Sequence, residues 1–185
     1  MKDGDRQGAE PPDQELVERG RSGDDAALGA LAERHHAAAY RVALSFVRED
    51  DLAQDVVQDA FVKAFRALAG FRADASFRTW LLTITANEAK EVLRRQGRRK
   101  ETALEDAGEV PSEESGPAHD AVMRDEANKA RRMLEQLPEK QRLSVTLRIE
   151  EGLSFKEIGD VIGSSEGAAR VNYFHGIRRL RELME

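Results

Sequence analysis

The sequence lacks cysteine, has few aromatic residues and contains no long apolar run. Among 185 residues there are no Cys, five Pro and 5% aromatic residues. The absence of Cys excludes a disulfide scaffold, a thiolate metal site and a thiol nucleophile. The longest uncharged run, Thr79–Asn87, has nine residues, whereas a membrane-spanning helix needs roughly 20. Residues 1–12 are polar and charged rather than basic and then apolar, so we predict no secretory signal and a soluble, cytoplasmic protein.

The net charge of −6 argues at first against a nucleic-acid partner, but it is unevenly distributed. Residues 1–20 carry −3 and residues 101–120 carry −7, whereas residues 21–100 carry +3 and residues 121–185 carry +1. The acidic segment 101–120 contains two Pro, two Gly and only two large apolar residues. That composition cannot bury enough apolar surface to offset the entropy lost on ordering.

This distribution predicts two domains, at residues 13–100 and 121–185. We expect residues 1–12 to form a disordered tail and residues 101–120 to form a flexible acidic linker. An acidic solvated loop without a further role is the alternative for that segment.

Both domains have a helical composition, rich in Ala, Leu, Glu, Arg and Gln and without alternating β-branched runs, which predicts an all-α fold. In the first domain we place helices at Asp13–Arg21, Asp24–Val47, Asp51–Ala69 and Phe77–Arg95. In the second domain we place them at Ala121–Gln136, Glu139–Glu150, Ser154–Ile162 and Glu166–Leu183. Asp24 is suited to an N-cap, Gly70 to ending a helix and Pro138 to beginning one.

The C-terminal domain contains the pattern of a helix-turn-helix. Ser154 and Glu157 have the spacing of a capping box. Gly159 allows close approach of a neighbouring helix, Gly163 allows a tight turn, and Ser165 can cap the helix that follows. An ordinary pair of antiparallel helices would share these features, so the second helix has to distinguish the two interpretations.

That second helix has an apolar arc and a mixed basic arc. The apolar arc, which we expect to be buried, comprises Ala169, Tyr173, Gly176, Ile177, Leu180 and Met184. The opposite arc comprises Arg170, Val171, Phe174, His175, Arg178 and Arg181. Because Val and Phe are unusual among cations on a solvated face, this arc predicts a partner. Arg can bond guanine edges, and Val and Phe can contact thymine methyls. Asn172 and Arg179 flank the arc and suit phosphate contacts.

A second basic surface is predicted on the helix that begins at Phe77. One stripe of this helix combines an aromatic ring, polar groups and cations: Trp80, Thr83, Asn87, Lys90 and Arg94. This mixture is typical of surfaces that bind unstacked single-stranded bases; a core Trp on a solvated basic helix is the alternative. The preceding loop could hold an extruded base through Phe71, Arg72, Asp74, Ser76 and Phe77.

The helix at Asp51–Ala69 has a different exposed face. Asp55, Gln58, Asp59 and Val62 make it acidic and partly apolar. This face would repel DNA and suits a protein partner, although a merely solvated face is the alternative. On the following helix, Glu88 falls within the predicted buried arc. It could face the opposing domain surface or a basic partner, and the sequence alone assigns it no role.

Several motifs together resemble the extracytoplasmic-function sigma factors of bacterial RNA polymerase. Asp55–Phe61, Phe71–Asp74, Phe77–Leu81 and Ile84–Lys90 are similar to region 2 of that family. Leu137 to Arg142, Glu151–Ile158 and the helix ending at Leu183 are similar to region 4. The recognition helix departs from the common pattern, because it has Ala168–Asn172 at its start and His175 with Gly176 further on. We therefore expect an unusual target sequence.

The resemblance implies a role in promoter recognition without catalysis or a cofactor. It implies that Asp55, Gln58, Asp59 and Val62 contact the clamp helices of the largest polymerase subunit, and that region 4 meets the flap of the second-largest subunit. The −10 element would be captured by Phe71, Arg72, Asp74, Ser76, Phe77, Trp80, Thr83, Asn87, Lys90 and Arg94. The −35 element would be read by Arg170, Val171, Asn172, Phe174, His175, Arg178 and Arg179. An anti-sigma factor is a further expected partner.

Two other functions are alternatives to a sigma factor. A dimeric helix-turn-helix repressor would bind a two-fold operator without polymerase, but it gives the Trp80 stripe no role. An enzyme is disfavoured because the four His residues have no spacing with carboxylates that suggests a metal site or a general base. Adjacent His35 and His36 would point to different helix faces.

Overall fold

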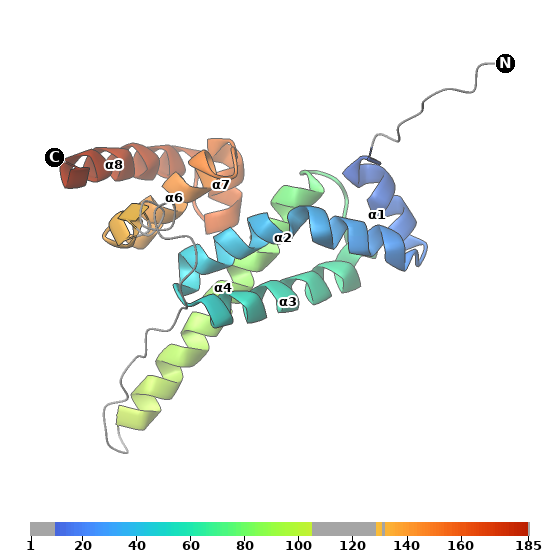
Figure 1. The fold of residues 1–185 in the computed structure, drawn as a ribbon, viewed down its shortest axis with the longest axis horizontal. Coiled ribbons are helices and arrows are strands. Elements are labelled where there is room, and N and C mark those ends of the chain that lie inside the picture. Colours follow the sequence, from blue (N-terminus) through green and yellow to red (C-terminus); the bar gives the residue numbers. More distant parts are fainter. Residues whose placement is uncertain (1–9, 105–128, 131, 185) are drawn as a thin grey trace.

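The computed structural model describes residues 10–104, 129–130 and 132–184 (Figure 1). Within these ranges the N-terminal domain contains helices α1 (Asp13–Arg21), α2 (Asp25–Val47), α3 (Asp50–Ala67), the 3-10 turn η1 (Leu68–Gly70) and α4 (Phe77–Leu104). The C-terminal domain contains α6 (Glu139–Ile149), α7 (Phe155–Ile162) and α8 (Glu166–Met184), and residues 129–130 and 132–135 are also helical. The described residues form no strand, which confirms the all-α prediction.

The N-terminal domain is a bundle in which α2, α3 and α4 pack against one another while α1 packs against α2 (Figure 1). Its core is filled by large aliphatic side chains that are fully buried, among them Leu31, Val42, Val56, Leu81 and Leu82. Each such side chain contributes about 1.5–3 kcal/mol through removal from water. Asp24 caps α2 as predicted, because its carboxylate accepts from the backbone N–H groups of Ala26 and Ala27 at 3.0 and 3.1 Å.

Helix α4 is longer than predicted. It continues past Arg95 to Leu104 and so includes residues 101–104, which the sequence had placed in the linker. Two ion pairs support the helix where it was expected to end, because Glu91 pairs with Arg94 and Arg95 one turn later. The tail residues 1–9, the rest of the predicted linker and the start of the helix predicted at Ala121 lie outside the described residues.

The helix-turn-helix is confirmed in the C-terminal domain. Ser154 and Glu157 form the predicted capping box at the start of α7. Gly163 adopts the left-handed conformation (φ 73°) that the turn requires. A Cβ on Gly159 would lie 2.7 Å from the Ser164 carbonyl oxygen, so only glycine permits this close approach. Helix α6 packs against both α7 and α8 and completes a small core that includes Leu143, Leu147, Ile158 and Val161.

The prediction that Met184 of α8 is buried is wrong. Met184 is 75% exposed, because α8 meets α6 around Gly176, which lies about two turns closer to the start of the helix.

The two domains also lie against each other, with α7 packed on α4 and α6 packed on α2 (Figure 1). In the part of the chain that the structure describes, no helix is both long enough and apolar enough to cross a membrane.

Candidate nucleic-acid and protein interfaces

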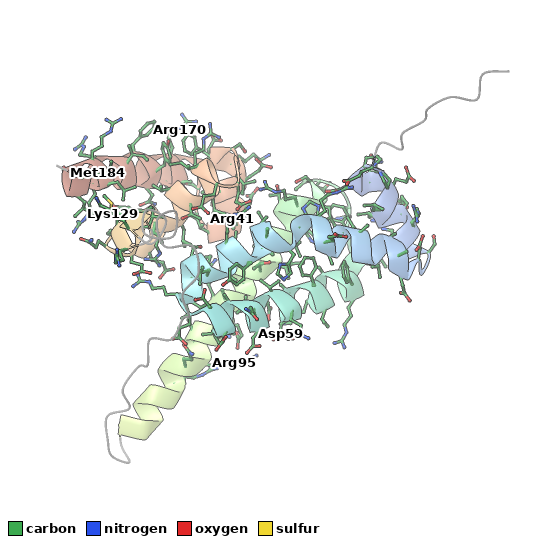
Figure 2. The ribbon with its side chains drawn as sticks, in the orientation of Figure 1. Arg41, Asp59, Arg95, Lys129, Arg170 and Met184 are labelled. Carbon is green, nitrogen blue, oxygen red and sulfur yellow. The ribbon has the colours of Figure 1, made fainter. Side chains whose placement is uncertain are left out.

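The outer face of α8 presents most of the residues predicted to read the −35 element. Val171 and Phe174 are 55% and 60% exposed, and Figure 2 shows Arg170 on the outer side of α8, away from the N-terminal domain. The remaining predicted residues with nitrogen-bearing side chains at the exposed part of this face are His175, Arg178 and Arg179. Asn172 is half-buried. The helix therefore offers a continuous face of cations and apolar groups to a partner.

An aromatic cluster supports this face from α7. The Phe155 ring lies 5.5 Å from that of Tyr173 and 6.3 Å from that of Phe174, centroid to centroid. The guanidinium of Arg170 lies 5.3 Å from the Phe155 ring, a cation–π contact, and its NH2 lies 2.7 Å from Glu166 Oε1. Phe155 is the first residue of α7, and its ring is half-buried. Its position beneath Arg170 depends on how α7 crosses α8, which the periodicity of a single helix does not reveal.

The loop between η1 and α4 exposes part of the predicted −10 site. Arg72, Asp74 and Ser76 are exposed. Ser76 also caps α4, because its hydroxyl oxygen accepts from the Thr79 backbone N–H at 3.0 Å. Ala73 has a left-handed backbone (φ 57°), a strained conformation for a residue with a side chain. Open grooves of about 660 and 250 Å³ flank the loop, the larger one lined also by α1.

Two aromatic residues of the predicted −10 site are largely buried and belong to the core. Phe71 and Phe77 are only 8% and 4% exposed. Their rings meet edge to face at 6.1 Å, and Phe71 also lies 4.8 Å from the half-buried Trp80. Both rings nevertheless line the larger groove beside the loop, so their part in holding a base stays a prediction. They form an apolar support under the loop, because burial of large rings outweighs their exposure on a short polar segment.

The predicted basic stripe of α4 is divided by the C-terminal domain. Asn87 and Arg94 are exposed, whereas Thr83 is half-buried and donates to the Thr79 carbonyl. Lys90 is covered by the end of α7, where its ammonium donates to the Ile162 carbonyl at 3.2 Å. Burial lowers the pKa of Lys90. The predicted stripe therefore lies along one face of α4, but in the folded chain α7 covers part of it.

A buried acidic residue joins the two domains. Glu151, whose side chain is completely buried, pairs with Arg41 Nε at 2.5 Å and with the guanidinium of Arg78. Arg78 also donates to the Glu151 carbonyl at 2.6 Å. A further hydrogen bond joins the Thr79 hydroxyl to Glu157 at 2.8 Å. No motif in the sequence predicts this contact, because these charged residues lie far apart in the chain and each resembles an ordinary surface residue.

The predicted protein-binding face of α3 is exposed as expected. Asp55, Gln58 and Asp59 are exposed and Val62 is 42% exposed. Figure 2 shows Asp59 at the edge of the molecule opposite Arg170. Glu88, which had no assigned role, forms an ion pair with Lys63 at 2.6 Å. This pair ties α4 to α3 and explains an acidic residue on a largely buried arc.

The His residues within the described ranges do not form a metal centre. There, no group of three or more His, Asp or Glu side chains is placed to hold a metal ion. His35 is buried and bonds Asp13 at 2.7 Å, whereas His36 stacks on Phe61 at 6.5 Å between centroids. The two rings do point to different sides of α2.

The two domains match two families in the order that the sequence suggested. The Sigma-70 region 2 family matches residues 31–99 and the Sigma-70 region 4 family matches residues 127–180. The ECF RNA polymerase sigma-E factor of Escherichia coli (strain K12) is 38% identical over 181 residues, covering 94% of this chain and 92% of that protein.

Two solved complexes have a similar fold. CnrH in complex with the cytosolic domain of CnrY has a TM-score of 0.69 at 27% identity, covering 93% of this chain and 96% of that one. The sigma factor RpoE in complex with the anti-sigma factor NepR from Bartonella quintana has a TM-score of 0.69 at 25% identity, covering 84% and 95%. This chain therefore belongs to the extracytoplasmic-function (ECF) sigma factors of RNA polymerase, and it is a transcription initiation factor rather than an enzyme.

Proposed function

We propose that this protein binds core RNA polymerase in the cytoplasm and directs initiation at promoters that it recognises through two separate surfaces. The observation that carries this proposal is the outer face of α8, where cations surround the exposed Val171 and Phe174. Such a face matches a helix that enters the major groove and reads a −35 element. In this proposal Arg170 and His175 contact base edges, and Arg178 and Arg179 contact phosphates.

The second surface is the exposed loop 71–76 together with the open part of α4. Arg72, Asp74, Ser76, Asn87 and Arg94 are accessible there, and we assign them to the unstacked −10 strand. Phe71, Phe77 and Trp80 support the loop, and Trp80 lines one of its grooves.

The partners follow from the remaining surfaces and from the relatives. The acidic, partly apolar face of α3 (Asp55, Gln58, Asp59 and Val62) is assigned to the clamp helices of the largest polymerase subunit, and the C-terminal domain to the flap of the second-largest subunit. Because a similar chain was solved with an anti-sigma factor, we assign such an inhibitor to this protein as well.

Simultaneous recognition of both elements requires the domains to separate. The −10 and −35 elements are about 25 base pairs apart, or roughly 85 Å at about 3.4 Å per base pair. In the structure, a hydrogen bond joins Thr79 at the −10 surface to Glu157 of α7, the helix that supports α8. Lys90 is also occupied by α7. The interdomain contacts must therefore break when the protein occupies a promoter.

Run-off transcription with purified chain and core polymerase tests the function directly. We expect promoter-specific transcripts only when both are present.

Arg170→Ala should weaken the free energy of promoter binding by about 1–3 kcal/mol at promoters that have the contacted base. The affinity for core polymerase should stay unchanged. Changing Asp55 and Gln58 together to Ala should instead lower the affinity for core. Absence of core binding, or operator binding with a two-fold footprint in the absence of polymerase, would contradict the proposal.

A further inference from the structure

We propose that Arg21 is a positioning residue for −10 recognition, because it holds the backbone at the start of the loop that carries Arg72, Asp74 and Ser76. This inference rests on the proposed −10 role of the loop. Arg21 is the last residue of α1, and no sequence motif includes it. It reaches across to η1 and the loop, which lie far from it in the chain.

The guanidinium of Arg21 is fixed at all three of its nitrogens. Nε donates to the Leu68 carbonyl at 3.1 Å, and NH2 donates to the Phe71 carbonyl. NH1 pairs with Glu18 Oε1 at 2.6 Å on the same helix. The side chain is only 26% exposed. One side chain thus joins both ends of the turn Leu68–Phe71 to α1, with the fork geometry that a guanidinium provides.

The neighbouring glycine brings α1 close enough for this reach. A Cβ on Gly20 would lie 2.5 Å from Leu28 Cδ2 and 3.2 Å from Leu68 Cδ2. Helix α1 therefore lies directly against α2 and η1, and Arg21 follows at the point where η1 ends. Arg21 also lines the groove of about 660 Å³ that α1 shares with residues 71 and 73–77.

The loop needs such support because it is strained and ends on a buried ring. Ala73 has a positive φ of 57°, and such conformations persist only where the surrounding structure enforces them. Phe71 anchors the loop from below through its ring contact with Trp80, and Arg21 anchors it through the backbone. Without Arg21, the Leu68 and Phe71 carbonyls lose a charged donor, and the loop loses the constraint on its first residue.

A merely structural role for Arg21 makes a different prediction from a positioning role. If Arg21 only joins α1 to the domain, its loss lowers stability and affects all DNA contacts equally. If it positions the loop, its loss affects the bases that the loop takes and spares those read by α8. A Lys has a single nitrogen in place of the two Arg21 nitrogens that bond these carbonyls, so Arg21→Lys should lie between the wild type and Arg21→Gln.

The test uses the full chain assembled with its cognate core polymerase and a pool of single-stranded DNA with a randomised stretch. Bound DNA is sequenced for the wild type, Arg21→Gln, Arg21→Lys and the control Arg19→Gln. Arg19 is a matched cation on α1 that pairs with Asp24 at 2.8 Å and does not touch the loop. A randomised double-stranded pool reports −35 recognition, and thermal unfolding of each free chain reports stability.

We expect the wild type and Arg19→Gln to enrich the same single-stranded motif. Arg21→Gln should lose preference at the one or two bases taken by the loop and bind the wild-type motif about tenfold more weakly, equivalent to about 1.4 kcal/mol. Its double-stranded preference should match that of the wild type. Full retention of the single-stranded motif by Arg21→Gln would overturn the inference, as would equal loss in both pools together with a lowered unfolding midpoint. A wild-type holoenzyme that enriches no single-stranded motif would instead overturn the proposed −10 role.

Discussion

Contacts that span the N-terminal domain determine the positions of single residues in and around the loop 71–76. Ala73 has the only positive φ among the loop residues 71–76, and it lies between Arg72 and Asp74, both of which are exposed. The left-handed backbone costs an L-residue about 1–2 kcal/mol. That cost falls on the segment assigned to base capture, where a fixed backbone conformation limits the entropy lost on binding.

Replacing Ala73 with Gly should stabilise the fold and weaken base recognition. Glycine adopts a positive φ without steric cost, although it also raises the entropy of the unfolded chain, so we expect a net gain of about 0.5 kcal/mol. Denaturant unfolding of the free chain measures this gain. Ala75→Gly is the control, because Ala75 has a negative φ and its replacement should destabilise. Equal destabilisation by both changes would contradict strain at Ala73.

The buried His35 should make stability depend on pH. Burial lowers its pKa, with Arg78 and Arg34 adding to this effect and the bond to Asp13 opposing it. Because the folded-state pKa lies below the unfolded value of about 6.5, the unfolded chain binds more protons as the pH falls. His35 therefore contributes to stability above about pH 6.5, and this contribution is lost below it.

His35→Gln isolates that pH effect. Gln retains a donor for Asp13 but does not titrate in this range. Denaturant unfolding at about pH 7.5 and about pH 5 should show a smaller fall in the free energy of unfolding for His35→Gln than for the wild type. An identical fall in both proteins would show that other groups cause the acid sensitivity.

Whole helices are held at close range by a small number of glycines. Helix α8 lies directly on α6 at Gly176, where a Cβ would be 2.7 Å from Val145 Cγ2 and 3.2 Å from the Gln141 carbonyl oxygen. This contact gives a physical reason for the glycine at position 176 of the recognition helix. In this chain, close packing of α6 and α8 takes the space that a methyl group would occupy, and it fixes the orientation of the recognition face.

Gly176→Ala should destabilise the C-terminal domain, because overpacking costs about 1–3 kcal/mol. This cost exceeds the roughly 0.8–1.0 kcal/mol of stability that Ala adds through its higher helix propensity. Thermal unfolding followed by circular dichroism measures the change. Gly167→Ala on the same helix is the control, because nothing lies within 4 Å of a Cβ there, and it should stabilise. A stabilising effect of Gly176→Ala would contradict the close approach.

At the scale of the whole molecule, the two domains are closed on each other through the Glu151 cluster. The completely buried carboxylate of Glu151 pairs with Arg41 and Arg78 of the N-terminal domain. Arg142 of α6 adds a hydrogen bond to the Ser45 carbonyl at 3.0 Å. Figure 2 shows Arg41 on the side of α2 that faces the C-terminal domain. In the proposed function the domains separate on a promoter, so these contacts would have to break before the chain occupies both elements.

Glu151→Ala should therefore open the molecule. Removing one partner of a buried ion pair costs about 3 kcal/mol or more, and separation of the domains lets Arg41 and Arg78 regain water. Because the sequence has no Cys, Arg66→Cys and Glu182→Cys provide the only two thiols for a fluorescence donor and acceptor. We expect lower energy transfer in Glu151→Ala than in the labelled parent.

Glu15→Ala is the control for this experiment, because Glu15 forms an exposed ion pair with Arg19 within α1. Its energy transfer should equal that of the parent. Unchanged transfer in Glu151→Ala would show that the cluster does not hold the domains together.

The sequence by itself determined the helices and the faces they expose. Capping at Asp24 and Ser154, the turn at Gly163 and the amphipathic arcs of α3 and α8 are local features, and periodicity within one helix is enough to predict which face is exposed. The outward position of Arg170 and Asp59 follows from this, as does the family resemblance.

Only the tertiary structure decided how these surfaces combine. It buried Phe71 and Phe77, covered Lys90 with α7 and paired Glu88 with Lys63. It also joined Arg21 to the loop and Glu151 to Arg41 and Arg78. Each of these contacts joins residues distant in the chain, or depends on how one helix crosses another. The local pattern of apolar and charged residues does not contain that information, because the same helices could bury a given charge or leave it in water depending on their partners.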